Sequence, residues 1–221
     1  MSYILHINTA LDNASVSLAD NEHVIAERLS NSQKEHASFL QVAIAEITTM
    51  AGIPLKNLSA VAVINGPGSY TGLRVGMSGA KGICFALSIP LITVNTLEWM
   101  AAACKEEADL FCPMIDARRM EVFTATYNHQ KIEVAPPTAM ILEPDSFKTE
   151  LQAKKVLFFG NGAEKFSALT NHPNARFMPV FPGTKELAEI AWNLYQERTF
   201  ADLAYAEPLY VKEFYTPVKA S

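Results

Sequence analysis

Apolar and polar positions alternate in the first part of the chain, and this alternation predicts three short strands. Turn-forming residues at 12–13 and 20–21 separate them. Apolar residues then recur at the spacing of one helical face, which predicts a long helix over residues 35–50. Alternating strands and helices follow. The predicted segments are strands 3–8, 14–19 and 23–29, helix 35–50, strand 60–64, helix 73–87, strand 91–94 and helix 97–107.

The second part of the chain repeats this order of elements. It again begins with three strand patterns, and helices and strands then alternate. The predicted segments are strands 111–116, 121–127 and 131–134, helix 145–152, strand 156–159, helix 163–169, strand 177–180 and helix 185–195.

Both halves therefore begin with the order β-β-β-α-β-α, which predicts mixed sheets covered by helices. We expect an N-terminal half at 1–107 and a C-terminal half at 108–221, with the last residues packing back on the first half. A duplicated unit of this kind matches the α/β class of the actin-like ATPase fold (ASKHA, RNase H-like), which also includes sugar kinases. In that fold a nucleotide lies between the halves and is held by loops.

The run Asn-Gly-Pro-Gly-Ser-Tyr-Thr-Gly-Leu-Arg at 65–74 joins a predicted strand to a predicted helix. Glycines allow a close backbone approach, and the first N–H groups of a helix have no partners, so this loop could bind an anion. It lacks the Gly-Lys-Ser/Thr of a phosphate-binding P-loop, the G-x-G-x-x-G of dinucleotide sites and the G-x-S-x-G of hydrolases. A tight connection that packs the helix closely on the sheet is an equal alternative.

Further candidate loops lie where the duplicated fold would hold a nucleotide. They are the first hairpin, the end of the first strand of the second half, and a Gly-x-Gly turn. These residues are also common in ordinary turns, which is the alternative explanation. The candidate phosphate or nucleotide residues are Asn8, Thr9, Gly66, Gly68, Ser69, Asp116, Gly160 and Gly162.

The helix after the glycine-rich loop carries Gly76, Gly79 and Gly82. Each costs about 1 kcal/mol relative to alanine in a helix interior. Close approach of another element would offset this cost. The apolar helix at 35–50 is a plausible neighbour, either within the chain or across an interface.

Composition narrows the class of protein. The 221 residues are 49% hydrophobic and 19% charged, as expected for a globular protein with a large core or interface. A net charge of −5 gives no general attraction to nucleic acid or to an anionic membrane. The longest apolar stretch, 82–94, is too short to span a bilayer. Three cysteines without C-x-x-C spacing disfavour disulfides and zinc, and we expect a cytoplasmic protein without a signal peptide.

Three segments resemble the TsaB family, also called YeaZ. The run at 66–82 closely resembles that family's first motif, Pro-Met-Ile-Asp-Ala-Arg-Arg-Met-Glu-Val-Phe at 113–123 its second, and Pro-Leu-Tyr-Val-Lys at 208–212 its C-terminal one. The resemblance extends over nearly the whole chain. It implies a role in forming threonylcarbamoyladenosine at position 37 of tRNAs that read ANN codons.

The resemblance also implies a catalytically inactive paralogue of the transferase TsaD. In TsaD, two histidines of a Val-Asn-His-Leu-Glu-Gly-His segment bind a metal, whereas Thr96 and Met100 stand at those positions here. We therefore expect no catalytic residue, no metal and no cofactor. Asn8 replaces an aspartate common in the family, and asparagine cannot act as a base, so independent ATP hydrolysis is not expected.

The function implied is that of a non-catalytic subunit that binds and supports TsaD, with the TsaE ATPase joining the assembly. The isolated chain is expected to form a homodimer through the same apolar helices, tRNA to be contacted only indirectly through the complex, and no membrane to be involved. The expected interface residues are Phe39, Leu40, Ala43, Ile47, Arg74, Gly76, Gly79 and Ile83.

An enzyme of the actin-like fold, such as a small-molecule kinase or ATPase, is the alternative. It would need a carboxylate that organises a metal, and Asp116 is the well-placed candidate. A metallopeptidase is disfavoured, because the five histidines contain no pair at metal-binding spacing.

Overall fold

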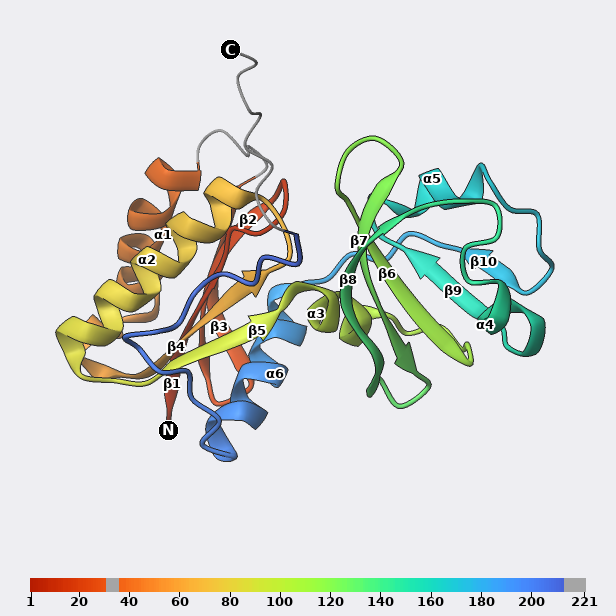
Figure 1. Cartoon of the computed structure of the whole chain (residues 1–221). Coiled ribbons are helices and arrows are strands. Elements are labelled where there is room, and N and C mark those ends of the chain that lie inside the picture. The colour runs from red at the N-terminus through yellow and green to blue at the C-terminus, as the bar shows by residue number, and fades with distance from the viewer. Residues whose placement is uncertain (31–35, 213–221) are drawn as a thin grey trace, which may run out of the picture.

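A computed structural model of the chain, which describes residues 1–30 and 36–212, contains two five-stranded sheets (Figure 1). Their strand orders are β3-β2-β1-β4-β5 and β10-β9-β6-β7-β8. In each sheet the three strands that come first in the chain pair antiparallel, as β1-β2-β3 and as β6-β7-β8. The two later strands of each sheet run parallel to its first strand, β4 and β5 to β1, and β9 and β10 to β6. The predicted duplication is therefore confirmed. The strands are β1 (Tyr3–Asn8), β2 (Ala14–Asp20), β3 (His23–Ser30), β4 (Leu58–Gly66), β5 (Leu91–Asn95), β6 (Leu110–Asp116), β7 (Glu121–Asn128), β8 (Glu133–Ile141), β9 (Val156–Phe159) and β10 (Ala175–Phe177).

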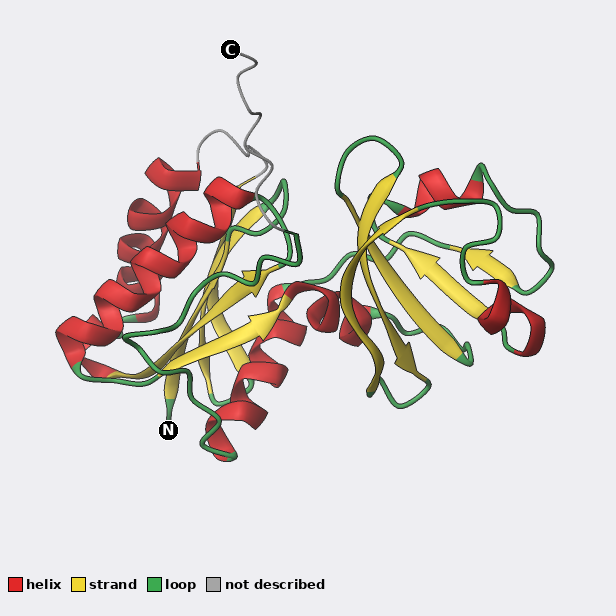
Figure 2. Ribbon diagram, in the orientation of Figure 1, coloured by secondary structure: helices red, strands yellow, loops and turns green. Residues whose placement is uncertain are grey.

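Helices and sheets form alternating layers (Figure 2). One pair of helices covers the outer face of the first sheet, a second pair lies between the sheets, and two short helices cover the outer face of the second sheet. In that order the pairs are α1 (His36–Ala51) with α2 (Tyr70–Leu87), α3 (Thr96–Ala103) with α6 (Thr184–Gln196), and α4 (Lys148–Ala153) with α5 (Ala163–Ser167); a 3-10 turn, η2, spans Leu55–Asn57.

Side chains alternate between the layers with the period of two that a strand imposes. In β4, Ala62 and Ile64 face the helices between the sheets, whereas Val61 and Val63 face α1 and α2. The core between the sheets contains residues of both halves, and Phe159 of β9 is fully buried in it. The two halves therefore share one hydrophobic core.

Helix α6 belongs to the C-terminal half in sequence but contacts β1, β3 and β5 of the first sheet. Beyond it, Ala201 pairs with Leu91 of β5. These residues follow position 107 in the chain and yet contact the first sheet. The division of the chain into halves after residue 107 therefore stays a prediction.

Most predicted element boundaries agree with the structure within three residues; β8 and α3 differ more, and the last strand shares only one residue with its predicted range. β8 runs over Glu133–Ile141 and not over 131–134, because its two prolines lie in an edge strand, where a missing N–H is tolerated. α3 ends at Ala103 and not at 107. The last strand lies at Ala175–Phe177, before the predicted 177–180. Glu35, the first residue of the predicted helix 35–50, lies outside the described residues.

The predicted neighbour of the glycine-bearing helix is present within the chain. A Cβ atom added to Gly79 would lie 2.8 Å from Leu40 Cδ2 of α1. The missing side chain therefore lets α1 approach α2 closely. No helix in the described part of the chain is long and apolar enough to cross a membrane.

Candidate functional site

A cleft of about 830 Å³ lies between the two halves of the molecule. The β1–β2 hairpin and β3 supply one side, α3 the floor, and α5 with the turn before it and the segment 177–185 the other side. This is the position at which the duplicated fold predicts a ligand between the halves.

Asn8 and Thr9, predicted in the first loop, are both buried at the end of β1. Asn8 lines the cleft, and its Oδ1 accepts a hydrogen bond from the backbone N–H of Ala10 at 3.1 Å. Thr9 does not line the cleft, since its Oγ1 donates to the carbonyl of Gly72 in α2 at 2.7 Å. The structure therefore places Asn8 in the cleft and makes Thr9 a link between hairpin and helix.

The glycine-rich loop at 66–69 lies outside the lining of the cleft. The Ser69 N–H donates to the carbonyl of Ala10 at 2.7 Å, and a Cβ atom on Gly68 would overlap that carbonyl. The Ser69 hydroxyl accepts from the Gly72 N–H at 3.3 Å and so caps α2. These contacts favour the tight-connection explanation of the loop, and its role in binding phosphate stays a prediction.

The last described residues cover this loop and the start of α2. The Leu209 N–H donates to the carbonyl of Asn65 at 2.7 Å. Gly66 has a φ of +120°, and a Cβ atom there would lie 2.8 Å from the Leu209 carbonyl oxygen, so a side chain would collide with this segment. Arg74 Nε donates to the Tyr210 hydroxyl at 3.0 Å.

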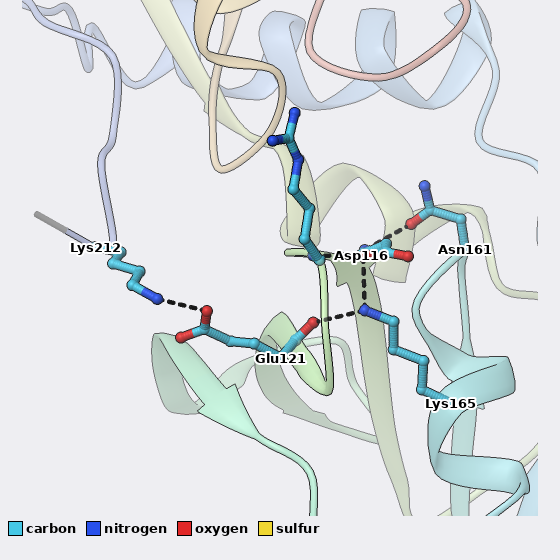
Figure 3. A network of polar contacts seen from close by, with 6 residues as sticks. Asp116, Glu121, Asn161, Lys165 and Lys212 are labelled. Carbon is cyan, nitrogen blue, oxygen red and sulfur yellow. Dashed lines mark hydrogen bonds and ion pairs between the residues drawn. The ribbon is translucent and has the colours of Figure 1, made fainter. Parts of the chain in front are cut away.

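Asp116 lies in a network of polar contacts at the end of β6 (Figure 3). Its carboxylate accepts from Lys165 Nζ at 2.6 Å, and its backbone N–H donates to Asn161 Oδ1 at 2.8 Å. The hydrogen bond from Lys165 is the main reason that the pKa of Asp116 is lowered. Lys165 also donates to the Glu121 carbonyl at 3.0 Å, and the Glu121 carboxylate pairs with Lys212 at 2.6 Å. Asp116 is thus held by a lysine and does not line the cleft.

The Gly-x-Gly turn packs against β6. Gly160, with a φ of +95°, lines the cleft, and a Cβ atom there would overlap the carbonyl of Met114. The Gly162 N–H donates to this same carbonyl at 3.1 Å, and a Cβ atom on Gly162 would lie 2.8 Å from Val122 Cγ1. The cleft therefore brings together Asn8 and Gly160 from opposite halves, but not the other candidates.

Helix α3 forms the floor of the cleft. Asn95 caps it, because its Oδ1 accepts from the Leu97 N–H at 2.8 Å. Thr96 is fully buried, and its hydroxyl has no hydrogen-bond partner among the described residues. Met100 is also buried and lines the cleft beside Trp99, whose Nε1 donates to the Gly183 carbonyl at 2.9 Å.

A hydroxyl and a thioether fit a hard or borderline metal ion poorly, so the residues at these two positions do not fit the metal of a TsaD-type site. Among residues 1–30 and 36–212, no three His, Cys, Asp or Glu side chains lie close enough together to hold a metal ion. His6, which is nearly fully buried in β1, lies 3.3 Å from Ser17 Oγ through Nδ1, and burial lowers its pKa to about 4.

The predicted interface residues differ in how exposed they are. Leu40, Ala43, Ile47 and Gly76 are buried between the first sheet and its outer helices, so they offer little surface to a partner. Phe39, Gly79 and Ile83 are partly buried, and Arg74 is exposed. The large apolar side chains of α1 and α2 that are exposed in the described residues are instead Val42, Met50 and Phe85, at 58%, 57% and 80%.

Sequence reasoning missed one wall of the cleft, the segment 177–183 before α6. We predicted a strand over its first half, and Pro179 and Pro182 were the signals of a non-regular segment. Glu27 of β3 was also missed. It accepts a hydrogen bond from the Thr184 hydroxyl, a contact between residues 157 positions apart that no local pattern could indicate.

Comparisons with known proteins agree with this architecture. The family profile of "TsaD: tRNA N6-adenosine threonylcarbamoyltransferase" matches residues 23–215. A tRNA threonylcarbamoyladenosine biosynthesis protein TsaB from Bacillus subtilis is 31% identical over 72% of this chain and 70% of its own. The TsaB of Escherichia coli is 27% identical over 95% of this chain and 94% of its own.

A solved structure of an uncharacterized Pseudomonas aeruginosa protein with similarity to the peptidase YeaZ superposes with a TM-score of 0.83. It is 23% identical, and the alignment covers 96% of this chain and 100% of that chain. The likeness shows that the two proteins share the fold. The predicted α/β class with mixed sheets is confirmed, and each sheet has five strands in the described residues.

Proposed function

Because the chain belongs to the TsaB/YeaZ family and acts in tRNA threonylcarbamoyladenosine biosynthesis, we propose that it is a non-catalytic subunit that binds the transferase TsaD and supports its activity. The observation that carries this proposal is the pair Thr96 and Met100. Both are buried in α3, at the two positions where the resemblance places the metal-binding histidines of TsaD, and Met100 also lines the cleft. The hydroxyl of threonine and the thioether of methionine are poor ligands for the kind of metal ion that two histidines bind.

The surface proposed to bind TsaD is the exposed side of α1 and α2. Three large apolar side chains, Val42, Met50 and Phe85, project from these two helices into solvent. Exposed apolar groups that gather on neighbouring helices are typical of protein–protein contact sites. In this proposal the TsaE ATPase joins the complex, tRNA is contacted through the complex, and the isolated chain forms a homodimer through the same helices.

Substitution of Phe85 by serine tests this surface. Phe85 is 80% exposed, so the change leaves the core intact, and we expect about a tenfold weaker affinity for TsaD, as for a central interface residue. Phe181→Ser is the matched control, because Phe181 is 87% exposed at the distant cleft. Binding is measured by isothermal titration calorimetry with purified TsaD. Equal affinity of both variants and the parent chain would argue against this surface.

Replacement of Gly79 would be a poorer test. A larger side chain there would collide first with Leu40 of the same chain, and so would disturb the packing of α1 on α2 before it reached any partner.

The alternative function, a small-molecule kinase or ATPase, depends on Asp116. This carboxylate is already paired with Lys165, and it lies outside the lining of the cleft. If the isolated chain hydrolysed ATP or phosphorylated a small substrate, and Asp116→Asn abolished that activity, the kinase explanation would replace our proposal.

A further inference from the structure

The cleft between the halves has the size and shape of a small-molecule site. Its volume of about 830 Å³ is within the range of about 300–1,000 Å³ that is typical of ligand pockets. Residues from both halves enclose it, whereas a protein partner needs a much larger and flatter area.

The walls of the cleft are apolar and partly open to solvent. Phe181 and Leu29 line it while remaining 87% and 63% exposed. Trp99, Met100 and Phe177 line it further in. Large apolar side chains left exposed around a concave site gain free energy when an apolar ligand covers them.

The charged groups of the lining favour a cation. Asp12, Glu27 and Glu164 contribute three carboxylates, whereas Lys185 contributes one ammonium group. That ammonium group lies 3.7 Å from a carboxylate oxygen of Glu189 on the next turn of α6. The charge of the lining residues is therefore negative, and it disfavours the phosphates of a nucleotide.

A lysine that adjoins the lining of the cleft in the sequence already has hydrogen-bond partners. Lys165, which follows Glu164 in α5, donates to the Asp116 carboxylate and to the Glu121 carbonyl at 2.6 and 3.0 Å. It would have to leave both partners to reach a phosphate in the cleft.

We propose that this cleft is a binding site for a small amine, a ligand with an aromatic or aliphatic body and one ammonium group. The apolar body would lie against Trp99, Met100 and Phe181, and the ammonium group would lie near the carboxylates of Glu27 and Glu164. This site is independent of the surface of α1 and α2 that we assign to TsaD.

Nuclear magnetic resonance tests the proposal directly. The chain has two tryptophans, and Trp192→Phe leaves the indole N–H of Trp99 as a single reporter at the cleft. Phenylbutylamine, phenylbutyrate and ATP are titrated separately up to low millimolar concentration. We expect the amine to shift the Trp99 resonance until the site is saturated. We expect it to bind about tenfold tighter than phenylbutyrate, because each of the two exposed carboxylates, Glu27 and Glu164, should strengthen its binding about threefold. ATP is expected to leave the resonance unmoved.

Variants separate the contributions of charge and shape. Glu27→Gln is expected to weaken phenylbutylamine binding about threefold, and Phe181→Ala to weaken it about fivefold. Glu143→Gln removes an exposed carboxylate remote from the cleft and should leave binding unchanged. Binding of phenylbutyrate or ATP as tight as that of the amine, or a Trp99 resonance that the amine does not move, would overturn the proposal.

Discussion

Two glycines in the middle of α2 are expected to respond in opposite ways to the same substitution. A Cβ atom added to Gly82 meets no atom within 4 Å in the described part of the chain, apart from the backbone of its own helix. A Cβ atom added to Gly76 would overlap the Thr9 hydroxyl and would lie 3.4 Å from Ile7 Cγ2 and 3.5 Å from Val63 Cγ2. The helix backbone is the same at both positions, so the difference isolates the packing of the helix on the sheet and hairpin.

The structure sets the size of each effect. Replacing glycine by alanine in a helix interior contributes about 1 kcal/mol to the free energy of unfolding at either position. At Gly76 this gain is opposed by overpacking of about 1–3 kcal/mol. Displacement of Thr9 from its 2.7 Å hydrogen bond to the Gly72 carbonyl costs about 1 kcal/mol more. We expect Gly82→Ala to raise the free energy of unfolding by about 1 kcal/mol and Gly76→Ala to lower it by about 1–3 kcal/mol.

Urea denaturation and calorimetry of the two variants measure this difference. For a chain of this size, 1 kcal/mol corresponds to a change in Tm of about 2–4 °C. A double-mutant cycle with Thr9→Ala identifies the cause, because removing the hydroxyl makes room for the new methyl group. The penalty of Gly76→Ala should then fall by at least about 1 kcal/mol. If Gly76→Ala stabilised the protein as much as Gly82→Ala, the packing argument would be refuted.

Three further predictions concern titration and surface pairing. Burial lowers the pKa of His6 to about 4 from 6.5, so the unfolded chain binds more protons than the folded chain between these pH values. The free energy of unfolding should therefore fall by up to about 3 kcal/mol as the pH drops from 6.5 to 4. An equally steep fall in the His6→Gln variant would contradict this prediction. Burial lowers the pKa of Lys131 to about 8 from 10.5, so the free energy of unfolding should rise as pH rises between these values. Lys131→Met should therefore stabilise the protein at pH 7, by about 1 kcal/mol because the lysine side chain is only partly buried, and should lose this advantage above pH 10.5. Urea denaturation at both pH values measures the difference. Lys212→Ala breaks an ion pair with Glu121 that is half-exposed on the lysine side and should lower the free energy of unfolding by less than about 1 kcal/mol. A fall in Tm of more than about 4 °C would show that this pair stabilises the fold more than a surface ion pair does.

The order of elements could be predicted from the sequence because it depends on local periodicity. β4, for example, alternates between two apolar faces, and α1 places Leu40, Ala43 and Ile47 on one buried face. β8 was underestimated, because the tolerance for its prolines depends on its position at the edge of the sheet, which local sequence does not reveal.

The site was only partly predictable. Asn8 and Gly160 were identified as candidates, since both follow strands of the duplicated unit, and both line the cleft. Thr9 and Gly68 were also candidates, yet Thr9 contacts α2 and Gly68 contacts Ala10. Tertiary packing decides whether a loop residue faces the cleft or a neighbouring element, and local sequence does not show it. The contact between Glu27 and Thr184 joins distant parts of the chain, so no motif signals it.

The rate of threonylcarbamoyl transfer to tRNA, measured with TsaD and TsaE in the presence and absence of this chain, tests the central claim most directly. We predict that the chain has no transfer activity alone, that it raises the rate when TsaD is present, and that Phe85→Ser reduces this stimulation. Transfer by the chain without TsaD, or a rate with TsaD and TsaE that the chain does not change, would contradict the account.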